Sequence, residues 1–65
     1  MFIVVNGQPH PSPRPQTLAA LLLLLSPQAP FAVALNDEVV RRGSFEDCWI
    51  HPGDRIDIVH PTAGG

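Results

Sequence analysis

Side chains that commonly carry catalysis or bind metals are few in this chain and lie far apart along it. The three histidines, His10, His51 and His60, show no spacing typical of metal ligands. The single cysteine, Cys48, stands next to Trp49 and is more typical of a small buried apolar residue than of a reactive thiol. The sequence also lacks a glycine-rich phosphate loop and a C-x-x-C motif. We therefore expect neither a catalytic site nor a metal site within the domain.

The final segment, Ala63-Gly64-Gly65, offers a different chemistry, that of a terminal carboxylate. A carboxylate must be activated, for example as an acyl-adenylate, before sulfur can displace a leaving group from it. Glycine lacks Cβ, so a Gly-Gly end suits a leader that threads a narrow channel and approaches a nucleotide closely. From Pro61 through Thr62 to Gly65, an extended chain spans at most ~17 Å, which is enough to place Gly65 in the active site of a partner. The alternative is an ordinary frayed end, which is common at chain termini.

Length and composition limit the classes of function. A chain of 65 residues is one small domain, with room for a modest core but not for a deep substrate cavity. We expect the folded domain to cover residues 1–60 and a flexible tail to cover residues 61–65. The formal net charge of −2 does not favour nucleic-acid binding. One cysteine allows no intrachain disulfide, which is consistent with the cytoplasm.

The most apolar stretch, Leu18–Leu25, is better explained as a core helix than as a membrane span, which needs ~20 residues. We expect Thr17 to cap this helix and Ser26-Pro27 to end it, because helical geometry is disfavoured before proline. Leucines at positions 18, 21, 22 and 25 share one helical face. Leu23 and Leu24 lie off that face, where loops or a partner would cover them.

Apolar segments of period two predict the strands. The first covers residues 2–5 and turns at Asn6-Gly7 into a second strand over residues 8–13. Prolines at alternate positions of the second strand remove N–H groups on one side, which a sheet edge tolerates. Further strands are expected over residues 31–35, 38–41 and 55–60, with turns at 36–37 and 51–54. We also expect a helical turn over residues 44–47, capped by Ser44.

This order of elements predicts a two-layer α+β domain, in which one helix covers one face of a mixed sheet of four to five strands. The first and last strands are expected side by side at its centre. Alternation places on the helix side Ile3, Val5, Val33, Leu35, Ile56 and Ile58. An apolar outer face near the tail is typical of a docking surface, and its candidate residues are Phe2, Val4, Ala32, Ala34 and Val59.

Several segments, taken in order, resemble the ThiS family of sulfur carriers in thiamine biosynthesis over essentially the whole chain. They are the strand ending at Asn6-Gly7, the helix starting at Thr17-Leu18, Val33-Ala34-Leu35-Asn36, Val39-Val40-Arg41, Gly53-Asp54 and Ala63-Gly64-Gly65. None is diagnostic alone, whereas their order, the short length and the Gly-Gly end are specific in combination. The proline-rich second strand and the leucine-rich helix depart from the family pattern, but both belong to the scaffold.

The resemblance implies a ubiquitin-like β-grasp fold and a co-substrate rather than an enzyme. It implies that Gly65 is adenylated by a ThiF-type, E1-like adenylyltransferase that uses ATP and magnesium. Thr62, Ala63 and Gly64 would be the part of the tail that threads into the enzyme. A sulfur donor such as a cysteine desulfurase would convert the adenylate to a thiocarboxylate, and a ThiG-type thiazole synthase would accept the sulfur. No cofactor would stay bound to the carrier.

Alternatives share this fold. A MoaD-type carrier for molybdopterin has the same tail and activation chemistry but is typically longer. A carrier for another sulfur metabolite, a ubiquitin-like modifier and a plain binding module are the others. Deletion of Gly65 separates the binding module, which would tolerate it, from the carriers and modifiers, which would not.

Overall fold

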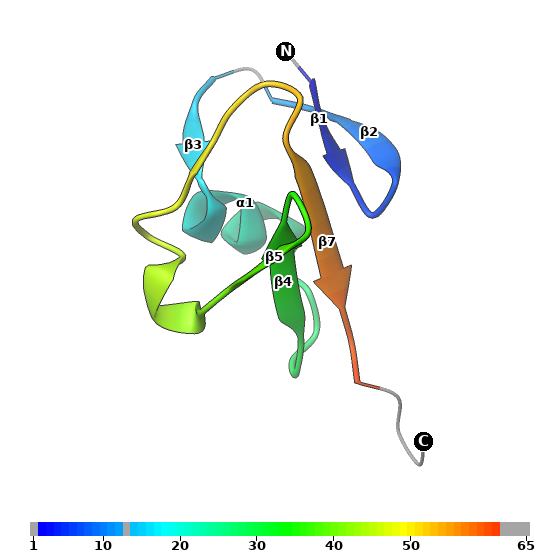
Figure 1. Cartoon of the computed structure of the whole chain (residues 1–65), viewed down its shortest axis with the longest axis vertical. Coiled ribbons are helices and arrows are strands. Elements are labelled where there is room, and N and C mark those ends of the chain that lie inside the picture. Colours follow the sequence, from blue (N-terminus) through cyan, green and yellow to red (C-terminus); the bar gives the residue numbers. More distant parts are fainter. Residues whose placement is uncertain (1, 13, 62–65) are drawn as a thin grey trace.

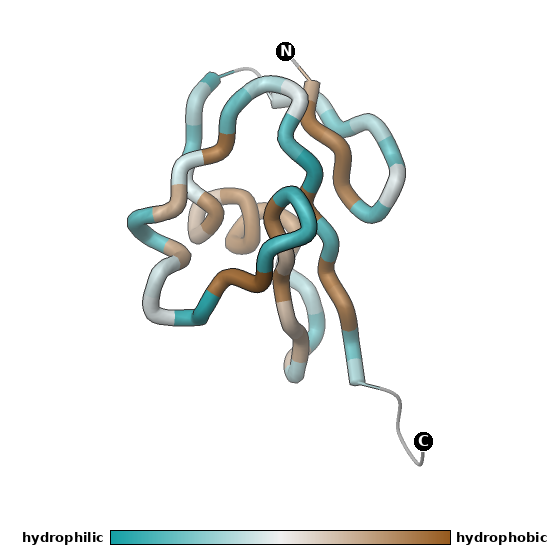
Figure 2. Tube along the Cα trace, in the orientation of Figure 1, coloured by the Kyte–Doolittle hydropathy of each residue, from teal (hydrophilic) through white to brown (hydrophobic). Residues whose placement is uncertain are grey.

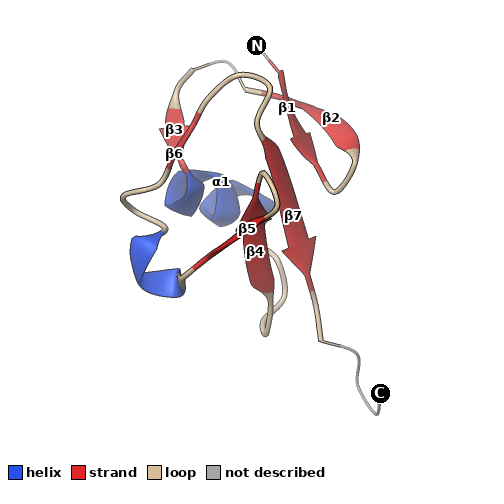
Figure 3. Ribbon diagram, in the orientation of Figure 1, coloured by secondary structure: helices blue, strands red, loops and turns tan. Residues whose placement is uncertain are grey.

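The computed structural model describes residues 2–12 and 14–61. One mixed sheet has the strand order β2-β1-β7-β4-β5, and α1 packs against one of its faces (Figure 1). A second sheet pairs two short strands, β3 and β6. The strands are β1 Phe2–Val5, β2 Gln8–Pro11, β3 Gln16–Thr17, β4 Ala32–Leu35, β5 Glu38–Val40, β6 Trp49–Ile50 and β7 Arg55–Val59; the helices are α1 Leu18–Leu25 and the 3-10 turn η1 Arg42–Ser44. The predicted two-layer α+β domain is confirmed (Figure 3).

Two tight hairpins form the outer parts of the sheet. In the turn between β1 and β2, Asn6 and Gly7 have φ of 50° and 80°. In the turn between β4 and β5, Asn36 and Asp37 have φ of 51° and 71°. Positive φ at both central residues gives the twist that joins antiparallel strands without splaying them, and asparagine, aspartate and glycine tolerate it best. Both predicted turns are confirmed.

The proline-containing strand β2 is at the edge of the sheet, as expected. Pro9 lies opposite Val4 and Pro11 opposite Phe2, so the prolines alternate with residues that pair through their N–H groups. The strand ends at Pro11, two residues earlier than predicted, and Pro13 lies outside the described residues. An edge that lacks alternate N–H donors is also a poor template for pairing with another chain.

Helix α1 begins and ends where the sequence indicates. The Thr17 hydroxyl accepts a hydrogen bond from the Ala20 N–H at 3.1 Å, which satisfies one of the free donors of the first turn. At the other end Ser26 adopts a left-handed conformation, with φ of 53°, and donates its N–H to the Leu22 carbonyl at 2.7 Å. No helix in the described part of the chain is long and apolar enough to cross a bilayer.

The core lies between α1 and the sheet, where apolar segments of both converge (Figure 2). Its buried members are Ile3, Leu18, Leu21, Leu22, Val33, Ile50 and Ile56. The other three sheet residues predicted for this side, Val5, Leu35 and Ile58, are half-buried and pack against it. Ile50 was not predicted, because it belongs to the short strand β6 that the sequence pattern does not reveal.

Some predicted boundaries were wrong. Ser44 does not cap a helical turn over residues 44–47; it is the last residue of η1, whose cap residue Arg41 makes no side-chain capping bond. The turn Arg42–Ser44 starts two residues before the predicted range, 44–47. The predicted strands over 31–35, 38–41 and 55–60 are each one residue shorter in the structure.

Candidate functional site: the strand that carries the tail

β7 is the central strand and leads directly to the end of the chain. It pairs in parallel with β1, with Val5 opposite Ile56, and antiparallel with β4, with Ala32 opposite Val59. Beyond Val59 the chain continues through His60 and Pro61, away from the sheet (Figure 1). The predicted tail residues Thr62, Ala63, Gly64 and Gly65 lie outside the described residues, and the described part of the site is the root of the tail at β7.

Two asparagines support β7 from opposite sides, and each belongs to a hairpin turn. On the β1 side, Asn6 Oδ1 accepts the Ile58 N–H at 2.7 Å, while the Asn6 N–H donates to the Ile56 carbonyl at 2.9 Å. On the β4 side, Asn36 Oδ1 accepts the Arg55 N–H at 2.9 Å. Asn6 therefore extends the β1–β7 ladder beyond the last paired residue of β1 and holds the part of β7 nearest the tail.

Asn6→Gly is expected to loosen the tail end of β7. Glycine keeps the positive φ of the turn but removes the acceptor of the Ile58 N–H, which should lower the free energy of unfolding by about 1 kcal/mol. Amide hydrogen exchange should become faster at Ile58 than at other β7 amides. Asn6→Asp, which keeps an acceptor oxygen at this place, is the matched control and should retain slow exchange. Equal exchange at Ile58 in all three proteins would contradict this role of Asn6.

The turn before β7 is fixed by Asp54. Its Oδ2 accepts the His51 N–H at 2.8 Å, and its Oδ1 accepts the Asn36 side-chain amide at 3.1 Å. Gly53, with φ of 84°, donates its N–H to the Phe2 carbonyl at 2.9 Å. Asp54 thus sets the entry to the central strand from within the turn predicted over residues 51–54.

The outer face of the sheet contains all five residues predicted for it. Phe2, Val59 and Ala32 are exposed, whereas Val4 and Ala34 are half-buried. Val39, which is 74% exposed, lies opposite Ala34 and belongs to the same face. Val39 was not among the residues predicted for this face, although alternation within the second hairpin indicates the direction of its side chain.

We expected an apolar outer face, but charged side chains divide it. Arg55 lies opposite Val4 and Asp57 opposite Ala34, so both point to the outer side. Arg55 forms ion pairs with Asp37 and with Asp57, the latter with Nε–Oδ2 of 3.5 Å. The hydrogen bond and the charge of Asp37 raise the pKa of Arg55 above its ordinary value. Near the tail this leaves a smaller apolar patch, the tail-side patch, formed by Ala32, Ala34, Val39 and Val59.

The histidines and the cysteine do not converge. His10 lies on β2, His51 in the turn before β7 and His60 after β7, where its ring centroid is 6.4 Å from that of Phe31. Cys48 is half-buried and packs against the core. Within residues 2–12 and 14–61, no group of three histidine, cysteine, aspartate or glutamate side chains is arranged to hold a metal ion.

Comparisons with known proteins agree on one family. The sequence model of the ThiS family matches residues 3–65. The crystal structure of the thiamine biosynthesis protein ThiS from Geobacter metallireducens is similar over 100% of both chains, with a TM-score of 0.88 and 28% identity. A solution structure of a thiamine biosynthesis protein from the same organism has a TM-score of 0.79 and 28% identity, over 100% of this chain and 88% of that one. This likeness confirms the β-grasp fold.

A curated relative contains a similar segment within a longer protein. It is a protein from Magnetococcus marinus named thiazole synthase, 39% identical over 67 aligned residues. The match covers 100% of this chain but 20% of that protein. The chain therefore spans about a fifth of the length of the curated relative that it matches.

Proposed function

The chain belongs to the ThiS family, and we propose that it is a sulfur carrier of thiamine biosynthesis whose Gly65 carboxylate carries the sulfur. The observation that supports this proposal best is the position of β7. The central strand, hydrogen-bonded on both sides, precedes the Gly-Gly segment by a few residues, so the domain holds the root of the tail firmly. A rigid handle with a thin glycine end is what an activating enzyme needs to bring a carboxylate to ATP.

In the proposed reaction sequence the carrier is a substrate and its partners are the enzymes. The Gly65 carboxylate attacks the α-phosphate of ATP, pyrophosphate leaves, and an acyl-adenylate forms on a ThiF-like adenylyltransferase with magnesium. A sulfur donor, such as the persulfide of a cysteine desulfurase, attacks the acyl carbon and AMP leaves. Reductive cleavage of the resulting acyl disulfide by a thiol leaves a thiocarboxylate on Gly65. A ThiG-like thiazole synthase then accepts this sulfur.

Of the three proposed partners, the thiazole synthase is the one that a comparison supports. The Magnetococcus protein is named thiazole synthase, and a segment similar to this whole chain makes up 20% of it. A carrier domain and a synthase in one polypeptide are consistent with two proteins that otherwise meet as separate chains.

Intact-mass spectrometry tests the proposal directly. The purified protein is incubated with ATP, magnesium, an adenylyltransferase of the ThiF type and a sulfur source, after its starting mass has verified a free carboxylate at Gly65. We expect a gain of ~16 Da, because one oxygen is replaced by sulfur. Covalent adducts to lysines of other proteins would indicate a modifier instead, and an unchanged mass would refute the carrier.

Val59→Glu is expected to weaken docking to the activating enzyme. Val59 is 58% exposed in the tail-side patch, next to the root of the tail, so a charge there would be desolvated on binding without disturbing the core. We expect KM for the carrier in the pyrophosphate-release assay to rise about tenfold, for a loss of roughly 1.4 kcal/mol.

Leu24→Glu is the matched control for this change, because it puts the same charge on an exposed apolar position of the helix layer. The melting temperature of both variants should stay close to that of the wild type. Unchanged adenylation kinetics in Val59→Glu would contradict the proposal that the tail-side patch contacts the activating enzyme.

A further inference from the structure

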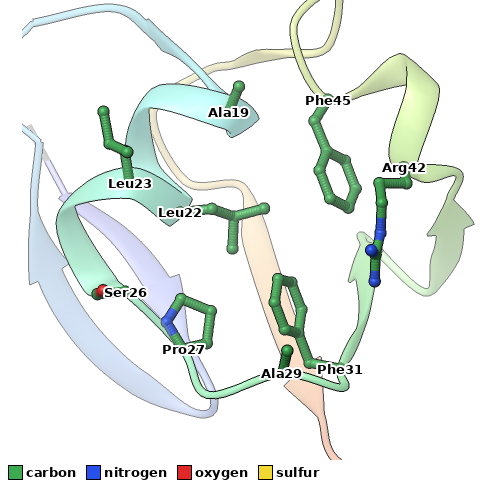
Figure 4. Close-up of a pocket in the computed structure, with 9 residues that line it drawn as sticks. All are labelled: Ala19, Leu22, Leu23, Ser26, Pro27, Ala29, Phe31, Arg42 and Phe45. Carbon is green, nitrogen blue, oxygen red and sulfur yellow. The ribbon is translucent and has the colours of Figure 1, made fainter.

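A hollow of about 390 Å³ opens beside α1, on the layer opposite the outer sheet face (Figure 4). One wall is α1 itself, and the other walls are the segment that leads into β4 and the turn around η1. The residues that matter here are Leu22, Leu23, Phe31, Arg42 and Phe45. The Phe31 and Phe45 rings both project into the space, and its lining is largely apolar (Figure 4).

The helix wall of the hollow exposes more apolar surface than the fold requires. All eight residues of α1 are alanine or leucine, and Leu23, which lines the hollow, is 84% exposed. A helix that is apolar on every side is normally buried on every side. Contiguous exposed apolar surface beside a hollow is typical of a protein–protein contact.

Arg42 gives the hollow a charge. Its guanidinium carbon lies 5.9 Å from the centroid of the Phe31 ring, a geometry that favours a cation–π contact. Among the described residues no carboxylate pairs with Arg42, whereas Arg55 has two acidic partners. An unpaired guanidinium at an apolar rim is complementary to a carboxylate that flanks an apolar side chain.

Phe31 links the hollow to the tail. The ring that Arg42 overlies also lies 6.4 Å from the His60 ring, centroid to centroid, at the point where the chain leaves the sheet. A protein that fills the hollow therefore contacts the domain close to the root of the tail. A single deep anchor surrounded by peripheral contacts is the usual arrangement at the centre of an interface.

We propose that this hollow is the docking site for the thiazole synthase, and that it receives an apolar side chain of the synthase whose neighbouring carboxylate binds Arg42. The inference rests on the proposed function. The activating enzyme and the synthase bind the carrier in turn, so each can use its own surface. The proposed function places the activating enzyme on the tail-side patch of the sheet, which leaves the hollow beside α1 open to the acceptor. The relative in which this domain forms part of a thiazole synthase supports the choice of partner.

Two pairs of neighbouring residues provide the test. Leu23 and Arg42 line the hollow, whereas Leu24 and Arg41 are exposed next to them and do not. Calorimetric titration of a purified thiazole synthase with each carrier variant measures Kd. We expect Leu23→Gln and Arg42→Glu to raise Kd at least tenfold, and Leu24→Gln and Arg41→Glu to change it less than twofold. Adenylation of all four variants by the activating enzyme should match the wild type.

The outcomes separate this inference from the proposed function. Equal Kd values within each pair, with a wild type that gains sulfur and binds the synthase, would overturn the hollow and leave the carrier function intact. A loss of adenylation instead of synthase binding would overturn its assignment to the synthase. A wild type that is neither loaded nor bound would refute the carrier itself. Leu23 is 84% exposed, so Leu23→Gln keeps the test open even if Arg42→Glu fails to fold.

Discussion

Leu21→Ala is expected to lower the free energy of unfolding by about 3 kcal/mol. The Leu21 side chain is fully buried at the centre of α1, among the residues that join the helix to the sheet. Removing it loses apolar burial and leaves a cavity, which together cost about 3 kcal/mol in comparable cores. A domain of 65 residues has a total stability of roughly 3–10 kcal/mol, so one such loss is a large part of the whole.

The same change three residues later provides the control. Leu24 belongs to the same helix and is 70% exposed, so Leu24→Ala removes the same atoms from a place where they contact little. Its effect should stay within about 0.5 kcal/mol. Urea denaturation followed by circular dichroism measures both variants. A similar midpoint for Leu21→Ala and Leu24→Ala would contradict the division of α1 into a buried and an exposed face.

The pattern of apolar residues predicted most of this architecture because the signals were local. Both hairpin turns contain residue pairs that tolerate positive φ, and Thr17 and Ser26-Pro27 mark the ends of α1 by capping and by proline sterics. Alternation then assigned the faces of β1, β4 and β7 correctly. In each case the physical cause operates within a few residues, so it can be recognised in the sequence.

Features that depend on distant contacts could not be predicted in this way. β3 and β6 are two residues each, too short for periodicity, and Thr17 pairs with Trp49, which is distant in the sequence. The second role of Asn6 also escapes the local pattern, because its oxygen accepts an N–H that lies 52 residues later. The turn pattern explains why an asparagine is tolerated at this position, but not which strand it supports.

The candidate site also has parts that local sequence signals predict and parts that depend on contacts between distant segments. The Gly-Gly end and the outer apolar residues follow from sequence order and parity. The ion pairs that cross the outer face, and the hollow beside α1, arise where separate elements meet. The sequence thus predicts which residues of a docking surface point outward. How these residues divide into an apolar patch and a charged strip can be seen only in the folded structure.

Deletion of Gly65 is expected to abolish sulfur loading while leaving the fold unchanged. The core residues all lie between Ile3 and Ile56, so the stability of the domain does not depend on residue 65. The shortened chain still ends in a glycine carboxylate, but that carboxylate lies ~3.5 Å nearer to the domain. A displacement of even 1 Å from a reactive geometry can cost a factor of about 100 in rate. We therefore expect adenylation to fall at least a hundredfold.

Pyrophosphate release and intact mass, measured on this variant, distinguish a tail that is too short from a domain that no longer binds the activating enzyme. If the domain docks through surfaces remote from its end, the truncated carrier should still bind the activating enzyme and inhibit loading of the wild type competitively. Such inhibition without a gain of ~16 Da would show that the partner recognises the folded domain and that the chemistry requires Gly65 itself. Loading at the wild-type rate would mean that the enzyme tolerates a shorter leader, and would contradict the assignment of the reactive carboxylate to one position.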